Sequence, residues 1–326
     1  MKHSRIGAAL AAALLSCSLL TSCDSQGGTE VTYMTAFGTF GREAYVYVAQ
    51  AKGYFEDAGI KVTIHPGQGT GDNLKLMTAG KADFAPVGAF SLAQAISGEK
   101  RLGVKAVAAL DQHTMASIMT KTTSGIVKPS DLAGRSVGGL PNSEVPALLT
   151  PYAYAVGIDP DSVKHVAATP TQLPGLLAGG SVDAIGQYVV SQGLIRKAVG
   201  GDVVIFPFRD HLPDVYGALL SVRQDLAAKD PELVRRFTAA LMKGLEYSID
   251  HPDEAGQIMQ KAVPAQDATQ TAAELKLLAP FDRVEGTAVG SVDEARAKRM
   301  LAEFETVGLL KRKLTFEDLF ETALLK

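Results

Sequence analysis

Two segments about 100 residues apart carry the same pattern, and this repeat constrains the fold more than any other feature. Leu76–Ala85 reads LMTAGKADFA and Leu176–Ile185 reads LLAGGSVDAI, so each indicates a helix end, a glycine turn and a short strand. The matched positions are Gly80 with Gly180 and Asp83 with Asp183. A repeated helix–strand unit predicts two α/β lobes with similar connections, not one long sheet.

The segments upstream of the repeat also correspond. A glycine that is typical of a helix C-terminus, Gly53 or Gly157, precedes a short apolar strand in both halves. These strands are predicted at 60–64 and 163–167. The correspondence therefore extends over more than one element.

The first unit of the chain reads as strand, loop, helix and strand. Val31–Thr35 alternates as a half-buried strand does, a helical pattern covers Arg42–Lys52, and Ile60–His65 forms the second strand. In such units the ligand lies beyond the carboxyl ends of the strands. Phe37–Glu43 is therefore a candidate ligand loop beside the start of a helix.

The chain crosses between the two predicted lobes twice. A buried-looking strand at 102–110 is interrupted by Asp111–His113 and resumes at 115–120. The chain then returns from a strand at 203–206 to one at 217–222. We expect two α/β lobes joined by two crossover segments, with a ligand cleft between them.

The predicted divisions follow from these crossovers. We expect lobe 1 to comprise 31–112 and 216–326, and lobe 2 to comprise 113–215. The carboxyl-terminal part of lobe 1 is predicted to be helical at 232–249, 253–262, 267–278, 293–307 and 316–324.

The N-terminus has the pattern of a lipoprotein signal peptide. Lys2 and Arg5 precede a Leu-rich stretch at 6–20 that is too short for a comfortable membrane span. Leu20-Thr21-Ser22-Cys23 matches a lipobox, and Cys17 is the weaker alternative because it would shorten the apolar region. We predict a signal peptide at 1–22, a polar tether at 23–30 and a lipid anchor at Cys23 on the extracytoplasmic face of the cell membrane.

Composition excludes several functions. A formal net charge of −3 gives no electrostatic support for nucleic-acid binding. No cysteine follows Cys23, so the body of the chain offers no disulfide or cysteine nucleophile, and the histidines lack metal-ligand spacing. The glycine turn at 66–72 has Asp72 where a dinucleotide fingerprint needs glycine, and Ser136 opens a strand where a nucleophile elbow would end one. We therefore predict no metal, no cofactor and no enzymatic activity.

Candidate ligand contacts come from loops that should face each other across the cleft. The loops after the paired strands, 88–91 and 187–189, occupy equivalent places in the two lobes. The candidates are Phe37, Thr39, Phe40, Gly41, Glu43, Thr70, Gly88, Ala89, Phe90, Asn142, Ser143, Glu144, Gln187, Tyr188, Asp214 and Tyr216. Each aromatic candidate has core packing as its alternative role, and Ser143 with Glu144 has helix capping.

The charges in these loops favour a ligand that donates hydrogen bonds. The acidic candidates are Glu43, Asp72, Asp111, Glu144 and Asp214, whereas the basic ones are mainly Arg42 and Arg209. Unpaired carboxylates repel an oxyanion but accept N–H groups and stabilise a protonated ring. The residues therefore favour a ligand that donates hydrogen bonds over an oxyanion.

Several motifs resemble one protein family. They are Tyr47-Val48-Ala49, Lys52-Gly53-Tyr54-Phe55, Gly59-Ile60-Lys61-Val62, 79–84, 128–138, Pro231-Glu232, 237–240, 251–255 and Gly308-Leu309-Leu310. In order and spacing they are similar to substrate-binding proteins of ABC importers for nitrate, sulfonates, taurine and pyrimidine precursors of thiamine. The resemblance implies a type II periplasmic-binding-protein fold and a monomer that closes on a small molecule and delivers it to a membrane permease. Among the ligands of this family, the acidic loops favour a small nitrogen heterocycle of the thiamine-pyrimidine-precursor type. Related thiamine-precursor binders often carry a tryptophan where Phe37 stands.

Two alternatives stay open at this stage. One is a sulfonate, taurine or nitrate binder of the same family. The other is a pyrimidine-precursor synthase-like enzyme on the same fold, which the missing cysteines disfavour.

Overall fold

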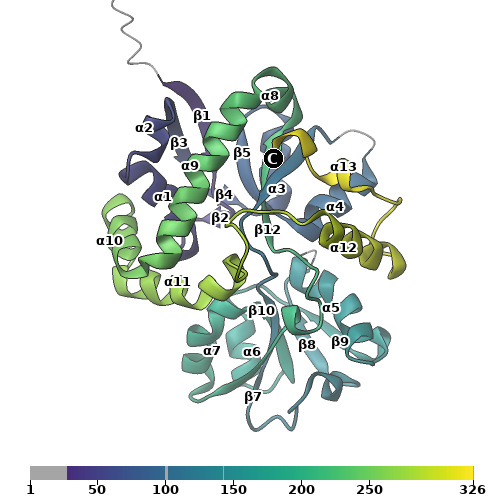
Figure 1. Cartoon of the computed structure of the whole chain (residues 1–326). Coiled ribbons are helices and arrows are strands. Elements are labelled where there is room, and N and C mark those ends of the chain that lie inside the picture. The colour runs from purple at the N-terminus through teal and green to yellow at the C-terminus, as the bar shows by residue number, and fades with distance from the viewer. Residues whose placement is uncertain (1–27, 100–101, 142, 326) are drawn as a thin grey trace, which may run out of the picture.

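The computed structural model describes residues 28–99, 102–141 and 143–325, which form two α/β lobes (Figure 1). The first lobe contains a five-stranded sheet in the order β3-β1-β5-β12-β6. Its strands are β1 (Thr29–Met34), β3 (Ile60–His65), β5 (Phe84–Gly88), β6 (Val104–Ala109) and β12 (Ala218–Arg223). Only β12 runs antiparallel to its neighbours. A small ribbon pairs β2 (Phe37–Gly38) with β4 (Gly67–Gln68).

The second lobe repeats this arrangement. Its sheet has the order β11-β7-β10-β8-β9, and the antiparallel strand again comes from a crossover. The strands are β7 (Ala116–Lys121), β8 (Ser136–Gly139), β9 (Lys164–Ala167), β10 (Ala184–Tyr188) and β11 (Val203–Pro207). The predicted two-lobed fold with two crossovers is confirmed.

The matched aspartates have the same structural role in both lobes. Asp83 Oδ2 accepts a hydrogen bond from the Thr32 amide at 2.8 Å, and Asp183 Oδ2 accepts one from the Ser136 amide at 2.8 Å. In each lobe the aspartate thus ties its own strand to the neighbouring parallel strand. Gly80 and Gly180 have φ of 70° and 71°, a conformation that glycine adopts without steric cost.

Helices cover both sheets. In the first lobe they are α1 (Ala44–Ala51), α2 (Tyr54–Asp57), α3 (Thr70–Thr78), α4 (Ala89–Gly98), α8 (Gln224–Lys229), α9 (Pro231–Asp250), α10 (Pro252–Ala262), α11 (Ala268–Asp282), α12 (Glu294–Thr306) and α13 (Phe316–Leu319). In the second lobe they are α5 (Glu144–Ala155), α6 (Leu173–Ala178) and α7 (Gln192–Val199). Short 3-10 turns are η1 (Gly41–Glu43), η2 (Pro129–Leu132), η3 (Pro160–Ser162), η4 (Val189–Ser191), η5 (Phe208–Asp210) and η6 (Thr322–Leu324).

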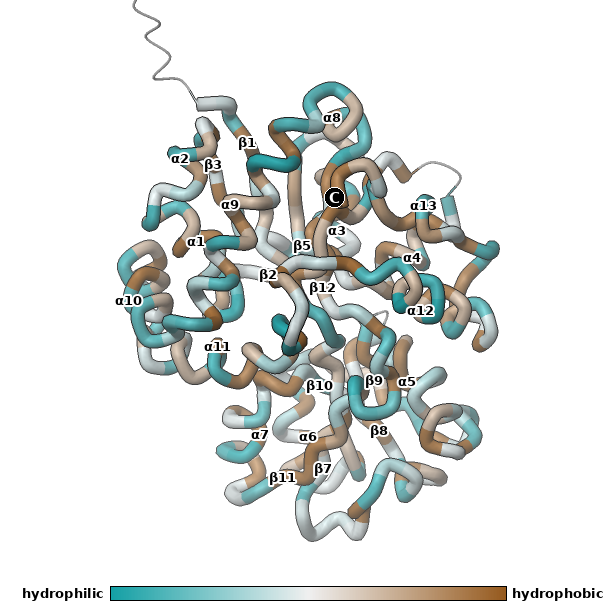
Figure 2. The backbone as a smooth tube through the Cα atoms, in the orientation of Figure 1, coloured by the Kyte–Doolittle hydropathy of each residue, from teal (hydrophilic) through white to brown (hydrophobic). Residues whose placement is uncertain are grey.

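The core of the first lobe is built around α9. Phe237 is fully buried and stacks on Phe84 and Phe55, with ring centroids 4.0 and 5.3 Å away. A Cβ on Gly244 would lie 2.4 Å from the carbonyl oxygen of Tyr45, so glycine is required where α9 crosses α1. Hydrophilic segments lie over outer helices such as α8 and α12 (Figure 2). In the described part of the chain, no helix combines the length and apolar character that a bilayer span needs.

The structure corrects several local predictions. Ser143 occupies the N-cap of α5 without capping it, because its hydroxyl donates to the Leu140 carbonyl. The predicted loop at 88–91 is absent because α4 starts directly after β5. The helix expected at 316–324 is divided into α13 and η6.

Candidate functional site

The carboxyl edges of the two sheets face each other where the chain crosses between the lobes (Figure 1). Gly88 ends β5, Asp111 follows β6, and Tyr188 ends β10. The lobes touch at this place: a Cβ on Gly88 would lie 3.1 Å from Oε2 of Glu144 in the opposite lobe. Carboxyl edges of α/β sheets are the usual ligand position. We call Glu43, Asp111, Glu144 and Asp282 the carboxyl cluster.

Glu43 is the carboxyl group that the first βα unit contributes. It ends η1 and is only 2% exposed. Its Oε1 accepts a hydrogen bond from the Ala36 amide at 3.1 Å, and its Oε2 accepts one from the Tyr45 hydroxyl at 3.3 Å. Burial raises the pKa of Glu43 to about 7, although nearby Arg42 acts in the opposite direction.

Glu144 is the carboxyl group of the second lobe. The Thr114 hydroxyl donates to its Oε1 at 2.9 Å, and the Tyr188 hydroxyl donates to its Oε2 at 3.1 Å. Burial between the lobes raises its pKa to about 7, against the effect of these two hydrogen bonds. Glu144 thus begins α5 without capping it and faces the first lobe.

Asp111 joins the two crossovers. Its Oδ2 accepts a hydrogen bond from the Ala218 amide at 3.0 Å, and its carbonyl oxygen accepts one from the Gly217 amide at 3.1 Å. A Cβ on Gly217 would lie 2.7 Å from that of Asp111, so only glycine allows the crossovers to approach this closely. Burial raises the pKa of Asp111 to about 6.

Asp282 completes the cluster from the last residue of α11. Its side chain is 5% exposed and faces Asp111 closely enough for a hydrogen bond between the two carboxyl groups. Burial and the negative charge of Asp111 raise the pKa of Asp282 well above its usual range. The site thus has a strong excess of carboxyl groups.

Arg42 is the cation beside this cluster. Its guanidinium lies 3.8 Å from Glu43 and 4.0 Å from Glu274, and it covers the Phe40 ring at 4.9 Å from the centroid. One arginine shared between two carboxylates leaves the region negative. The arrangement favours a cation or a hydrogen-bond donor over an anion.

Phe37 and Phe40 form an exposed aromatic pair next to η1. Their rings stack at a centroid distance of 6.3 Å and an interplanar angle of 6°, and they are 52% and 42% exposed. Apolar rings with this exposure at the start of the candidate ligand loop are available to cover the face of a planar ligand.

Three predicted contacts lie elsewhere. Phe90 is 2% exposed and packs edge-on against Phe304, so it is a core residue, which was the alternative role considered for it. Asp214 binds Arg299 through two hydrogen bonds of 2.8 Å. Tyr216 is fully buried, and its hydroxyl accepts a hydrogen bond from the Asp293 amide at 2.9 Å. Asp214 and Tyr216 therefore attach the second crossover to α12.

The other predicted residues have varied surroundings. Thr39 and Thr70 are half-buried near the β2–β4 ribbon, and the Gln187 carbonyl accepts a hydrogen bond from Ser117 at 2.7 Å. Ala89 is fully buried, and a Cβ on Gly41 would lie 2.5 Å from Glu274. Asn142 and Cys23 lie outside the described residues.

Sequence reasoning missed Asp282, Thr114, Tyr45 and Asn73. Asn73 is buried and donates from Nδ2 to the Thr35 and Ala36 carbonyl oxygens at 2.9 and 3.2 Å, which fixes the ligand loop. Asp282 ends a helix that was predicted to stop at residue 278, so no periodic signal marked it. An Asp at the C-terminal end of a helix, where the helix dipole is unfavourable, was the available clue.

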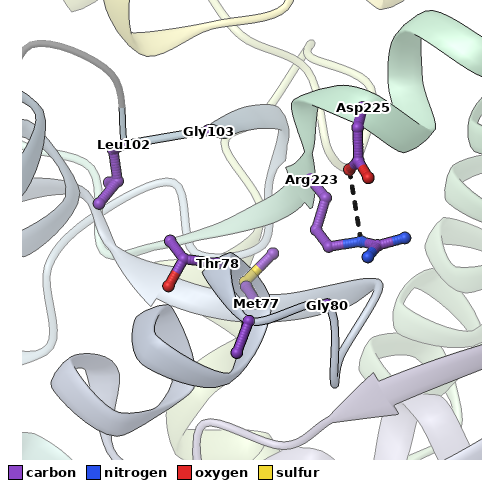
Figure 3. Close-up of a pocket in the computed structure, with 8 residues that line it drawn as sticks. Met77, Thr78, Gly80, Leu102, Gly103, Arg223 and Asp225 are labelled. Atoms are coloured by element: carbon purple, nitrogen blue, oxygen red, sulfur yellow. Dashed lines mark ion pairs between the residues drawn. The ribbon is translucent and has the colours of Figure 1, made fainter.

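A surface cavity of about 360 Å³ lies at the opposite end of the first sheet (Figure 3). It is lined by Met77, Thr78, Ala79, Gly80, Leu102, Gly103, Arg223 and Asp225. These residues precede β5 and β6 or follow β12, so the cavity is at the amino edge and apart from the carboxyl cluster. Arg223 there is already paired with Asp83 and Asp225 at 3.2 and 3.5 Å.

Comparison with known proteins identifies a matching family and several similar binding proteins. The model of the family described as "NMT1/THI5 like" matches residues 42–255. The chain is 26% identical over 250 residues to a formylaminopyrimidine-binding protein of Halalkalibacterium halodurans, covering 76% of this chain and 74% of that one. It is 28% identical over 224 residues to the riboflavin-binding protein RibY of Chloroflexus aurantiacus, covering 67% and 62%.

The fold is also found among solved structures. The periplasmic aliphatic sulphonate binding protein SsuA of Escherichia coli matches 91% of this chain and 99% of its own, with a TM-score of 0.72 and 15% identity. At this identity the likeness shows the fold and not the ligand.

Proposed function

The chain belongs to the NMT1/THI5 like family, and we propose that it is the extracytoplasmic substrate-binding protein of an ABC importer for a small nitrogen heterocycle of the thiamine-pyrimidine-precursor type. The observation that carries this proposal is the carboxyl cluster, to which both lobes contribute. The similar formylaminopyrimidine-binding protein supports the same ligand class.

Electrostatics separates this ligand from the anionic alternative. Two like charges about 4 Å apart repel each other by about 4 kcal/mol at an effective dielectric constant near 20. When Glu43 and Glu144 are ionised, a sulfonate or nitrate between them would meet this repulsion from both lobes, with Arg42 as a partner that is already shared. An aminopyrimidine instead donates N–H groups to carboxylates, and its protonated form gains further stability.

The aromatic side chains complete the proposed site. Phe37 and Phe40 cover one face of the ring, and Tyr188 approaches from the second lobe while its hydroxyl stays on Glu144. Ring contacts of this kind add roughly 0.5–1.5 kcal/mol beyond the burial of apolar area. In this proposal, Phe37 takes the place of the stacking tryptophan that related proteins often carry.

The proposed mechanism is binding by lobe closure. A ligand that contacts Glu43 in one lobe and Glu144 in the other stabilises the closed arrangement selectively, so it shifts an open–closed equilibrium. The crossovers at 110–115 and 211–217 serve as hinges, with the lobes divided at 112–113 and 215–216. The closed protein then delivers its ligand to the permease.

We propose further that the protein is a monomer without enzymatic activity, attached to the membrane by lipid at Cys23. A synthase-like reaction is disfavoured because no cysteine follows Cys23. The polar segment at 23–30 would act as a tether between the lipid and the lobes.

A thermal-shift panel tests the ligand class. At a ligand concentration 100 times Kd the fold gains about 2.7 kcal/mol, which is visible as a higher Tm. We expect hydroxymethyl- and formylaminomethyl-aminopyrimidines to raise Tm, and taurine, an alkanesulfonate and nitrate to leave it unchanged. The opposite pattern would refute the proposal.

Two variants locate the site in the same assay. Glu144→Gln and Tyr188→Ala should each reduce the pyrimidine-induced shift without unfolding the ligand-free protein. Glu56→Gln, on the exposed face of α2, is the matched control and should behave as wild type.

A further inference from the structure

The pair of Asp111 and Asp282 lies at the hinge end of the carboxyl cluster. Asp111 is fixed by the amide of Ala218, so its position depends on both crossovers. Asp282 is fixed by α11, whose adjacent residues also bind the opposite side of the hinge: the Phe281 carbonyl accepts from the His113 amide at 3.0 Å, and the Pro280 carbonyl accepts from Arg209 at 2.8 Å.

Asp282 has an unused acceptor. Its Oδ1 is buried and accepts no hydrogen bond from an N–H or hydroxyl group of the described residues, and the residue is 95% shielded from solvent. A buried carboxyl oxygen without a partner costs stability, and native proteins retain such atoms mainly where function needs them. This unpartnered atom distinguishes Asp282 from Glu43 and Glu144, whose oxygens accept hydrogen bonds.

The position of Asp282 in α11 adds to the negative potential. It is the last residue of a 15-residue helix and lies at the negative end of the helix dipole, where the Pro280 carbonyl already accepts a hydrogen bond from the Arg209 guanidinium. A carboxylate is unfavourable there, whereas a cation is favourable. Both the dipole and the neighbouring Asp111 therefore favour a positively charged hydrogen-bond donor at this point.

We infer that Asp282 and Asp111 form a subsite that binds the amino-bearing, protonated edge of the heterocycle. This inference rests on the proposed function and extends it, because it assigns the polar edge of the ligand to the hinge and leaves the ring to Phe37, Phe40 and Tyr188. An N–H donor bound there fills the free Oδ1 and holds α11 against both crossovers. Ligand recognition and hinge geometry are then determined by the same two side chains.

Calorimetric titration with two matched pyrimidines tests the subsite. One probe is 4-amino-5-hydroxymethyl-2-methylpyrimidine, and the other carries a methyl group in place of the 4-amino group. The wild-type protein should bind the amino compound more tightly. Asp282→Asn, which preserves shape but replaces one carboxyl oxygen with an N–H donor, should reduce the amino-over-methyl affinity ratio about tenfold or more, because a buried ligand N–H that meets another donor stays unpaired.

The amino-over-methyl affinity ratio distinguishes a loss of ligand recognition from a folding defect. A purely structural defect in Asp282→Asn would weaken both compounds equally and leave the ratio unchanged, and this result would overturn the inference. Asp57→Asn, on exposed α2, is the control and should retain the wild-type ratio. If wild type binds neither compound, the proposed ligand class fails and the subsite fails with it. If wild type discriminates and Asp282→Asn does so equally well, only the subsite is refuted.

Discussion

Raising the pH from 5 to 8 should open the lobes of the ligand-free protein. The closed arrangement brings together Glu43, Glu144, Asp111 and Asp282, and burial raises the pKa of each. A carboxyl group with a raised pKa in the closed form binds its proton more tightly there than in water. Its contribution to closure is therefore complete below the ordinary pKa and is lost as the pH rises to the raised one.

The magnitude follows from Glu144, the carboxyl group of the cluster that contacts the opposite lobe at Gly88. The pKa of Glu144 rises from 4.5 to about 7, so its full ionisation disfavours closure by about 3 kcal/mol, or roughly three-hundredfold in the closed-to-open ratio, when opening returns the carboxyl group to water. The loss occurs between about pH 4.5 and pH 7. Glu43 titrates in the same window, but its hydrogen-bond partners Ala36 and Tyr45 belong to its own lobe, so its ionisation affects closure less. His113 does not contribute to this pH response, because burial lowers its pKa to about 4 and its ring stays neutral between pH 5 and pH 8.

Small-angle scattering provides the assay. The radius of gyration should be larger at pH 8 than at pH 5 without ligand, and a bound aminopyrimidine should restore the smaller value at pH 8. The double variant Glu43→Gln/Glu144→Gln should lose most of this pH response. A radius that is equal at both pH values, or smaller at pH 8, would refute the reasoning.

Two further predictions concern the core and the anchor. Phe237→Ala should reduce the free energy of unfolding by about 3–5 kcal/mol in urea titrations, because it removes the ring that stacks on Phe84 and Phe55. The control Leu277→Ala, at a position 38% exposed, should cost less than about 1 kcal/mol. Similar losses in the two variants would contradict the packing argument. Cys23→Ser should abolish labelling by a fatty-acid analogue while Cys17→Ser retains it, and equal labelling of the two variants would exclude the anchor at Cys23.

The sequence by itself determined the architecture of the two lobes. Gly80 with Gly180 and Asp83 with Asp183 mark the same local geometry, because a positive φ after a helix and a side-chain link between adjacent strands both depend on nearby residues. Periodicity also located α9. These features are local or repeated, so they are visible in a linear pattern.

The composition of the site was decided by the tertiary structure. Glu43 and Glu144 were predicted because each follows the carboxyl end of a strand, but Asp282 lies at the end of a helix, and only the packing of α11 against the crossovers brings it to Asp111. Conversely, Asp214 and Phe90 follow strands and yet face Arg299 and Phe304. Chain position indicates which edge of a sheet a residue occupies, whereas the direction of its side chain depends on partners that are distant in sequence.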